Sequence, residues 1–136
     1  MTRLTLPYPI SANRYWISFY APRLKRVCVG PTKEAKAYRS EVGWIAREAG
    51  VRQPTTHPIR LALTLVPKNG VVMDLSNCLK VAEDALQGVA YVNDRQVKAI
   101  SLAYGEPDGK GALIVEIDEF IPDPPPLFAD VDQVHA

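Results

Sequence analysis

The alternation of apolar and polar residues predicts a chain of several strands and two helices. A period of two runs through residues 59–66, where Leu61, Leu63 and Leu65 would point inward, and this predicts a half-buried strand. Other β-rich runs predict strands at residues 3–6, 15–20, 26–29, 97–104 and 112–118. The second and third of these runs flank APRLK, which predicts a hairpin with a basic tip. The last two flank GEPDGKG, which predicts a hairpin-like connection.

A period of three to four residues predicts the two helices. Thr32 opens the first and Gly50 ends it, and its apolar stripe repeats at Ala35, Tyr38, Val42, Ile45 and Ala49. The second spans about residues 76–87, ends before Gly88 and has apolar positions at Leu75, Leu79, Ala82 and Leu86. This order of elements predicts an α+β (mixed α/β) fold, with a small mixed sheet and two main helices. We expect a single domain over residues 1–120 and a flexible, acidic, Pro-rich tail over residues 121–136.

Length and composition narrow the class of protein. The chain has 136 residues, 47% hydrophobic and 23% charged, which fits one globular domain. No long apolar run and no secretory signal occur, so we expect a cytoplasmic protein without a membrane span, in which Cys28 and Cys78 stay reduced. Cysteine and histidine are scattered singly and form no zinc pattern. Any metal would therefore be bound by carboxylates.

The near-neutral net charge of +1 conceals an uneven distribution. Residues 1–40 contain eight Lys and Arg against Glu34 alone, a local charge of +7, and the rest of the chain sums to −6. A basic block of this density favours a surface that binds a polyanion, because phosphate contacts release counterions. A solvated helix face and a charged hairpin would give the same count. Charge alone therefore leaves nucleic-acid binding open.

The residues that are candidates for catalysis or metal binding lie between positions 74 and 97. On a helix, Ser76, Lys80 and Asp84 are spaced by four and form one polar stripe. Asp74 precedes this helix and Asp94 follows it. If the next strand packs beside the N-terminal end of the helix, Asp94 approaches Asp74, and two carboxylates suit a hard cation such as Mg²⁺. Lys80 would then place a positive charge on a phosphate.

Ordinary structural roles explain the same residues. Asp74 or Ser76 can cap the helix, because Asp and Ser are favoured at that position. Asn93 and Asp94 are typical turn residues. Lys80 and Asp84 can form an exposed pair on the helix surface. Spacing alone does not decide between these roles and a catalytic site.

In its motifs the chain resembles the RusA-type Holliday junction resolvases, over about residues 3–120. The resemblance lies in LPYPISANRYW near the start, AKAYRSEV in the first helix, D-L-x-N-x-x-K-x-x-x-D-A-L from Asp74 to Leu86, and NDRQV. It implies a RusA-like fold and a homodimer that binds four-way (Holliday) or otherwise branched DNA. It also implies a DNA endonuclease that uses Mg²⁺ or Mn²⁺ to make paired symmetric nicks.

The resemblance also implies roles for single residues. Asp74 matches the first metal-binding aspartate of the motif D-L-D-N, Asp94 matches the aspartate after the helix, and Lys80 matches an essential lysine. Two further matches with supporting roles are Asn77 and Asp84, and two in the N-terminal loop are Asn13 and Arg14. For contact with DNA we expect Arg14, Arg23, Lys25 and Arg26, followed by the outward face of the first helix.

The chain departs from the family pattern in ways that bear on activity. The second aspartate of D-L-D-N is Ser76 here, and a hydroxyl is a much weaker ligand for Mg²⁺ than a carboxylate. Position 93 is Asn where an acidic residue is common, and only Lys68 stands where arginines precede the motif. Two hypotheses follow: a metal-dependent resolvase, weakened or inactive because of Ser76, and an inactive protein of the same fold that binds branched DNA. A small enzyme of another kind, using Asp74 and Asp94, is a third.

Overall fold

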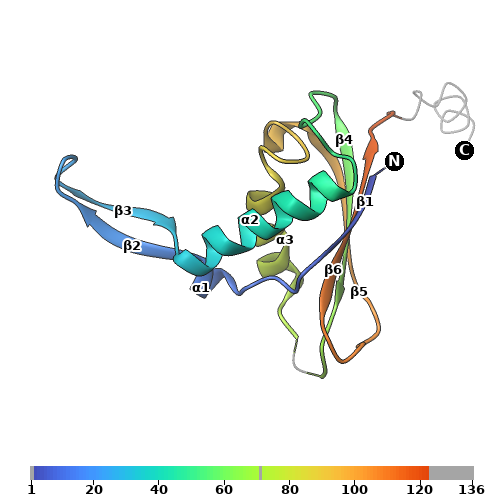
Figure 1. The fold of residues 1–136 in the computed structure, drawn as a ribbon, viewed down its shortest axis with the longest axis horizontal. Coiled ribbons are helices and arrows are strands. Elements are labelled where there is room, and N and C mark those ends of the chain that lie inside the picture. Colours follow the sequence, from blue (N-terminus) through green and yellow to red (C-terminus); the bar gives the residue numbers. More distant parts are fainter. Residues whose placement is uncertain (1, 71, 123–136) are drawn as a thin grey trace, which may run out of the picture.

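The centre of the molecule is a four-stranded sheet in the order β1-β6-β4-β5 (Figure 1). The computed structural model describes residues 2–70 and 72–122. The strands of this sheet are β1 (Thr2–Leu6), β4 (Ile59–Val66), β5 (Val97–Tyr104) and β6 (Ala112–Glu119). β6 is antiparallel to both its neighbours, whereas β5 is parallel to β4. The sheet is therefore mixed, which confirms the predicted fold class.

Two helices, α2 (Lys33–Glu48) and α3 (Leu75–Leu86), pack against the sheet and close the core (Figure 1). Their ends follow the local chemistry. The side chains of Thr32 and Asp74 cap the two N-termini, and Gly50 and Gly88, just beyond the C-termini, adopt positive φ. Leu61, Leu63 and Leu65 of β4 are buried against the helices, as the alternating pattern predicts.

The structure corrects the predicted apolar stripes and one connection. Ala49 is exposed and Ala46 is buried in its place, and in α3 the most deeply buried face includes Cys78 and Val81, whereas Leu75 and Leu79 are only partly buried. The sequence GEPDGKG does not close a hairpin, because β4 lies between β5 and β6. A turn-forming sequence shows that the chain reverses, but it does not determine which strands pair.

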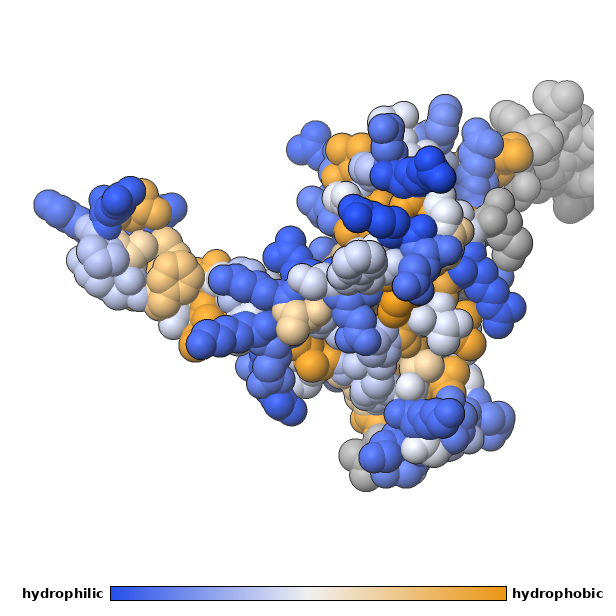
Figure 2. Space-filling view, in the orientation of Figure 1, coloured by the Kyte–Doolittle hydropathy of each residue, from blue (hydrophilic) through white to orange (hydrophobic). Residues whose placement is uncertain are grey.

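The second sheet is a two-stranded arm that projects from the core (Figure 1). It consists of β2 (Trp16–Ala21) and β3 (Arg26–Pro31), and it follows a short helix α1 (Ala12–Tyr15) that the sequence pattern did not indicate. Apolar residues are exposed along the arm, with hydrophilic residues at its tip (Figure 2). The most exposed apolar side chains are Ile17, Tyr20, Leu24, Val27 and Val29. The predicted hairpin with a basic tip is confirmed.

No helix in the described ranges is long and apolar enough to cross a bilayer. β6 ends at Glu119, and residues 123–136 lie outside the described residues. The expected boundary at residue 120 and the expected tail therefore stay predictions.

Candidate functional site

A shallow groove of about 310 Å³ lies beside α3 and contains several of the predicted site residues. Its walls are formed by Trp16, Lys80, Glu83, Asp84, Gln87 and Asp94. Lys80, Glu83 and Asp84 come from one face of α3, because positions i, i+3 and i+4 of a helix share a side, and Gln87 is the residue that follows the helix. The structure thus places Lys80 and Asp84 on one side of the helix, as their spacing predicts, and brings Asp94 beside them. Their chemical roles stay predictions.

Two carboxylates in this groove repel each other. The pKa of Glu83 is raised above its usual value, first because partial burial disfavours its charge and second because the charge of Asp94 is near. Glu83 is not among the site residues predicted from the sequence. Its position three residues after Lys80, on the same helix face, is the signal that could have identified it.

Asp84 is held in place by groups from two other segments. Its Oδ2 atom accepts a hydrogen bond from the Tyr15 hydroxyl, and Arg39 Nε lies 3.7 Å from the same oxygen. Burial and the neighbouring carboxylate raise the pKa of Tyr15, so the hydroxyl stays protonated and acts as the donor of this hydrogen bond. The ion-pair partner of Asp84 among the described residues is Arg39, not Lys80. These contacts suit a supporting role for Asp84 better than a free ligand.

Asp74 lies at the opposite end of α3 from Asp94. The Tyr104 hydroxyl, at the end of β5, donates to the backbone oxygen of Met73 over 2.9 Å. β5 therefore ends where α3 begins, and Asp94, which precedes β5, lies beside the C-terminal half of α3. A helix of twelve residues is about 18 Å long. The expectation that Asp94 approaches Asp74 is thus wrong for a single chain, because helix and strand run in opposite directions.

The carboxylate of Asp74 caps α3, and Asn77 holds it. It accepts a 2.8 Å hydrogen bond from the backbone N–H of Asn77 and a 3.2 Å hydrogen bond from Asn77 Nδ2. Ser76 is exposed and lies on the same side of the helix as Lys80, one turn earlier, but it does not line the groove. The capping role of Asp74 is confirmed, and its carboxylate remains exposed to solvent.

The turn that carries Asp94 is fixed by its neighbours. Asn93 caps a short 3₁₀ helix, Asp94–Gln96, by accepting from the backbone N–H of Arg95. The side-chain oxygen of Gln96 accepts a hydrogen bond from the backbone N–H of Asn93. The Nε2 atom of Gln96 donates to the backbone oxygens of Thr55 and His57. Asn93 is therefore a turn residue, as one alternative proposed. The turn holds Asp94 against the groove.

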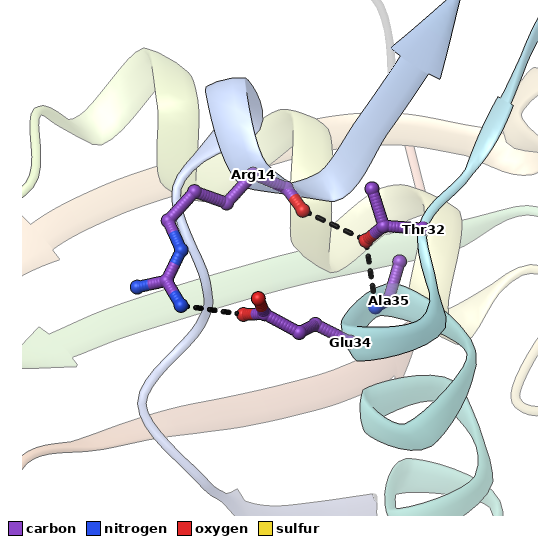
Figure 3. Close-up of polar contacts among 4 residues, drawn as sticks. All are labelled: Arg14, Thr32, Glu34 and Ala35. Carbon is purple, nitrogen blue, oxygen red and sulfur yellow. Dashed lines mark hydrogen bonds and ion pairs between the residues drawn. The ribbon is translucent and has the colours of Figure 1, made fainter. Parts of the chain in front are cut away.

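The base of the arm is tied to the start of α2 (Figure 3). Arg14 Nη2 lies 2.8 Å from Glu34 Oε2, and the Thr32 hydroxyl donates to the backbone oxygen of Arg14 while accepting from Ala35 N. The predicted DNA contact Arg14 is thus already paired with an acid. The other expected contacts are exposed, Asn13 in α1 and the three basic residues of the arm tip, Arg23, Lys25 and Arg26.

Other groups do not extend the site. Burial raises the pKa of the Cys78 thiol to about 11, so Cys78 is a small core residue, as the sequence suggested. Within residues 2–70 and 72–122, no group of three or more His, Cys, Asp or Glu side chains is placed so that it could hold a metal ion. Of the three carboxylates in the groove, Asp84 is engaged by Tyr15 and Arg39, which leaves Glu83 and Asp94 as a pair.

The repulsion between Glu83 and Asp94 gives a direct prediction. Asp94→Asn removes one of the two causes of the raised pKa, so the pKa of Glu83 should fall part of the way towards its usual value. Carbon-detected NMR titration of the Glu83 carboxyl would measure the change. Asp118→Asn, on β6, is the matched control and should leave the pKa unchanged. An unchanged pKa in Asp94→Asn would show that the two groups do not interact.

Of two comparisons of the sequence with known proteins, one gives a match. No curated protein matches the chain. The family model described as "Endodeoxyribonuclease RusA" matches residues 7–118, which include the base of the arm, both long helices and the groove. The match covers most of the chain, so the chain belongs to the RusA family of DNA endonucleases, whose members resolve Holliday junctions.

Proposed function

We propose that this chain is a cytoplasmic, metal-dependent endonuclease that acts as a homodimer and cuts four-way DNA junctions by paired symmetric nicks. The observation that supports the proposal most strongly is the groove in which Lys80 lies beside the carboxylates of Glu83 and Asp94. A cationic side chain beside paired acids is an arrangement that suits phosphodiester hydrolysis.

The donors in the groove suit Mg²⁺ or Mn²⁺. Such cations prefer oxygen ligands, and Mg²⁺ is often held by one or two carboxylates together with waters and substrate phosphates. Glu83 and Asp94 would hold such a cation, and its charge would offset both the burial of Glu83 and the repulsion by Asp94 that raise the pKa of Glu83. When bound, it would supply an activated water and neutralise charge on the phosphate. We assign Asp74 and Asp94 to the metal, as expected from the sequence, and add Glu83.

The remaining groups act on the phosphate or on the ligands. Lys80 is exposed on the groove face of α3, where its ammonium can contact a non-bridging phosphate oxygen and stabilise the charge that develops there. Asp84 fixes the wall of the groove through Tyr15 and Arg39. Asn77 orients the carboxylate of Asp74. Asp84 and Asn77 are therefore positioning residues.

A homodimer would account for two features of the single chain. Asp74 and Asp94 lie at opposite ends of α3, so a site that uses both needs one of them from a second copy. The arm also exposes Val27 and Val29 at 68% each, and a two-stranded ribbon is only marginally stable alone. We propose that the arms pack in the dimer and that each site combines Asp94 of one copy with Asp74 of its partner.

Mixing two inactive variants tests this arrangement. Asp74→Asn and Asp94→Asn should each reduce nicking of a labelled four-way junction by at least about a hundred-fold, while junction binding survives. Mixed and refolded together, they should regain part of the activity as single nicks, because one of the two shared sites is then intact. A mixture as inactive as its components would show that each chain supplies its own site. Loss of junction binding in either variant would assign that aspartate to structure.

Ser76 supports a second candidate, a protein that binds branched DNA without cutting it. The residue is exposed one turn before Lys80, at the position where the family motif has aspartate, so the site has one carboxylate fewer. This reading retains the fold, the dimer and the basic arm and omits catalysis.

The variant Ser76→Asp distinguishes the two candidates. The added carboxylate should strengthen divalent-metal binding and raise nicking in Mg²⁺ or Mn²⁺ by about ten-fold or more. Ser101→Asp, an exposed serine of β5, adds the same charge away from the groove and should have no effect. If neither the natural sequence nor Ser76→Asp cuts a junction, the nuclease proposal fails. If only the variant cuts, the natural sequence is the binding protein.

We propose that DNA is contacted by Asn13 and Arg14 at the base of the arm and by the basic residues of its tip. Arg23, Lys25 and Arg26 are exposed, and neither of the two ion pairs found among the described residues involves them. Two basic tips at a fixed separation in a dimer would favour an opened junction over a linear duplex, because such recognition depends on shape.

The salt dependence of junction binding tests the tip. Replacing Arg23, Lys25 and Arg26 together with alanine should flatten the log–log slope of affinity against salt by about 0.9 for each phosphate that the tip no longer neutralises. A matched triple variant at three exposed basic residues of the main sheet, Arg3, Arg60 and Lys98, should leave the slope unchanged. An unchanged slope in the tip variant would show that the arm lies away from the DNA.

A further inference from the structure

A second pocket, of about 360 Å³, adjoins the groove and takes no part in the proposed chemistry. It lies between the second half of α2, the segment that follows α2, and the two residues Gly88 and Val89. Gln87 lines the groove, so the groove and the pocket meet at consecutive residues after α3.

The wall of the pocket contains an exposed aromatic ring and two arginine side chains. Trp44 is 64% exposed, and the guanidinium carbon of Arg47 lies 5.8 Å from the centre of its ring. Gly43 leaves open space beside it, since a Cβ at this position would meet no atom within 4 Å. Arg52 forms another part of the wall.

Neither arginine is neutralised within the described chain. The ion pairs found in residues 2–70 and 72–122 join Arg14 to Glu34 and Arg39 to Asp84. Arg47 and Arg52 therefore give the pocket a net positive charge that an anionic ligand can balance. A single exposed tryptophan is common on protein surfaces. An exposed tryptophan in a hollow beside unpaired arginines has the chemistry of a nucleotide site, because bases stack on aromatic faces and guanidinium groups bind phosphate.

We propose that this pocket binds one unpaired nucleotide of the DNA, whose base stacks on Trp44 and whose phosphate is held by Arg47 and Arg52. The inference rests on the proposed action on DNA and adds a subsite to it. Exposing a base at a branch point costs unstacking energy, and a site for an unstacked base beside the groove would offset that cost. The pocket thus favours branched over fully paired DNA.

Binding of a short single strand tests the subsite without cleavage. The probe is a fluorescein-labelled pentathymidylate, measured by anisotropy in EDTA so that no divalent metal takes part. Trp44→Ala should weaken binding by about five- to a hundred-fold, the reduction expected from removing one stacking interaction. Trp44→Phe retains an aromatic face and should stay within about three-fold of the natural chain.

The arginines are tested against a matched residue elsewhere. Arg47→Ala and Arg52→Ala should each flatten the salt dependence of binding by about 0.7, the value for one phosphate of a single strand. Arg60 also lies over an aromatic ring, 5.9 Å from the centre of Phe120, but belongs to neither the pocket nor the groove. Arg60→Ala should leave binding unchanged, which separates the pocket from a general effect of charge.

Clear results overturn the proposal. It fails if Trp44→Ala, shown to be folded by circular dichroism, binds the probe as tightly as the natural chain. It also fails if the pocket binds a peptide of residues 121–136 through Trp44 and does not bind the probe. A chain that binds the probe through Trp44 and yet never nicks a junction retains the subsite and loses the proposed nuclease function.

Discussion

The hydrogen bond between the Tyr15 hydroxyl and Asp84 is the contact on which the working parts of the molecule depend. The Tyr15 ring is completely buried, so its hydroxyl needs an acceptor, and Asp84 on α3 is that acceptor. Arg39 brings α2 to the same carboxylate. Because the arm begins at Trp16, the contact that fixes α3 also fixes the direction in which the arm leaves the core. It places Trp16 in the wall of the groove as well.

Helix α2 has one side buried in the core and another that faces the pocket. One side, with Ala35, Tyr38 and Val42, fills the core and gives the helix its stability through burial. The other side begins beside the groove at Arg39 and continues through Trp44 to Arg47. A helix that binds on one side and packs on the other keeps its binding groups in fixed relative positions, since the packed side determines its rotation.

Local sequence patterns predicted most of the helices and strands. What they could not predict is the direction in which these elements run relative to one another in the fold. Thr32, Gly50 and Gly88 mark helix ends through their own backbone and side-chain chemistry, so the boundaries were accessible from the sequence. The separation of Asp74 from Asp94 could not be predicted, because it depends on β5 running opposite to α3, and no short sequence pattern encodes that direction. The groove is intermediate. The residues that α3 contributes, Glu83 included, could be predicted from their helical spacing. The presence of Trp16 could not, because it depends on how the chain before the arm packs against α3.

The position of β6 has a consequence for how the chain folds. The last strand of the sheet in sequence lies between the first strand and β4, and Thr2 pairs with Ile117, 115 residues away. Closing so long a loop costs entropy before any ladder hydrogen bond is gained, and such pairings slow folding. During synthesis, β1 has no partner in the main sheet until β6 has emerged. The main sheet is therefore completed only after β6 has emerged, and until then β1 and β4 leave open edges to which another chain can pair.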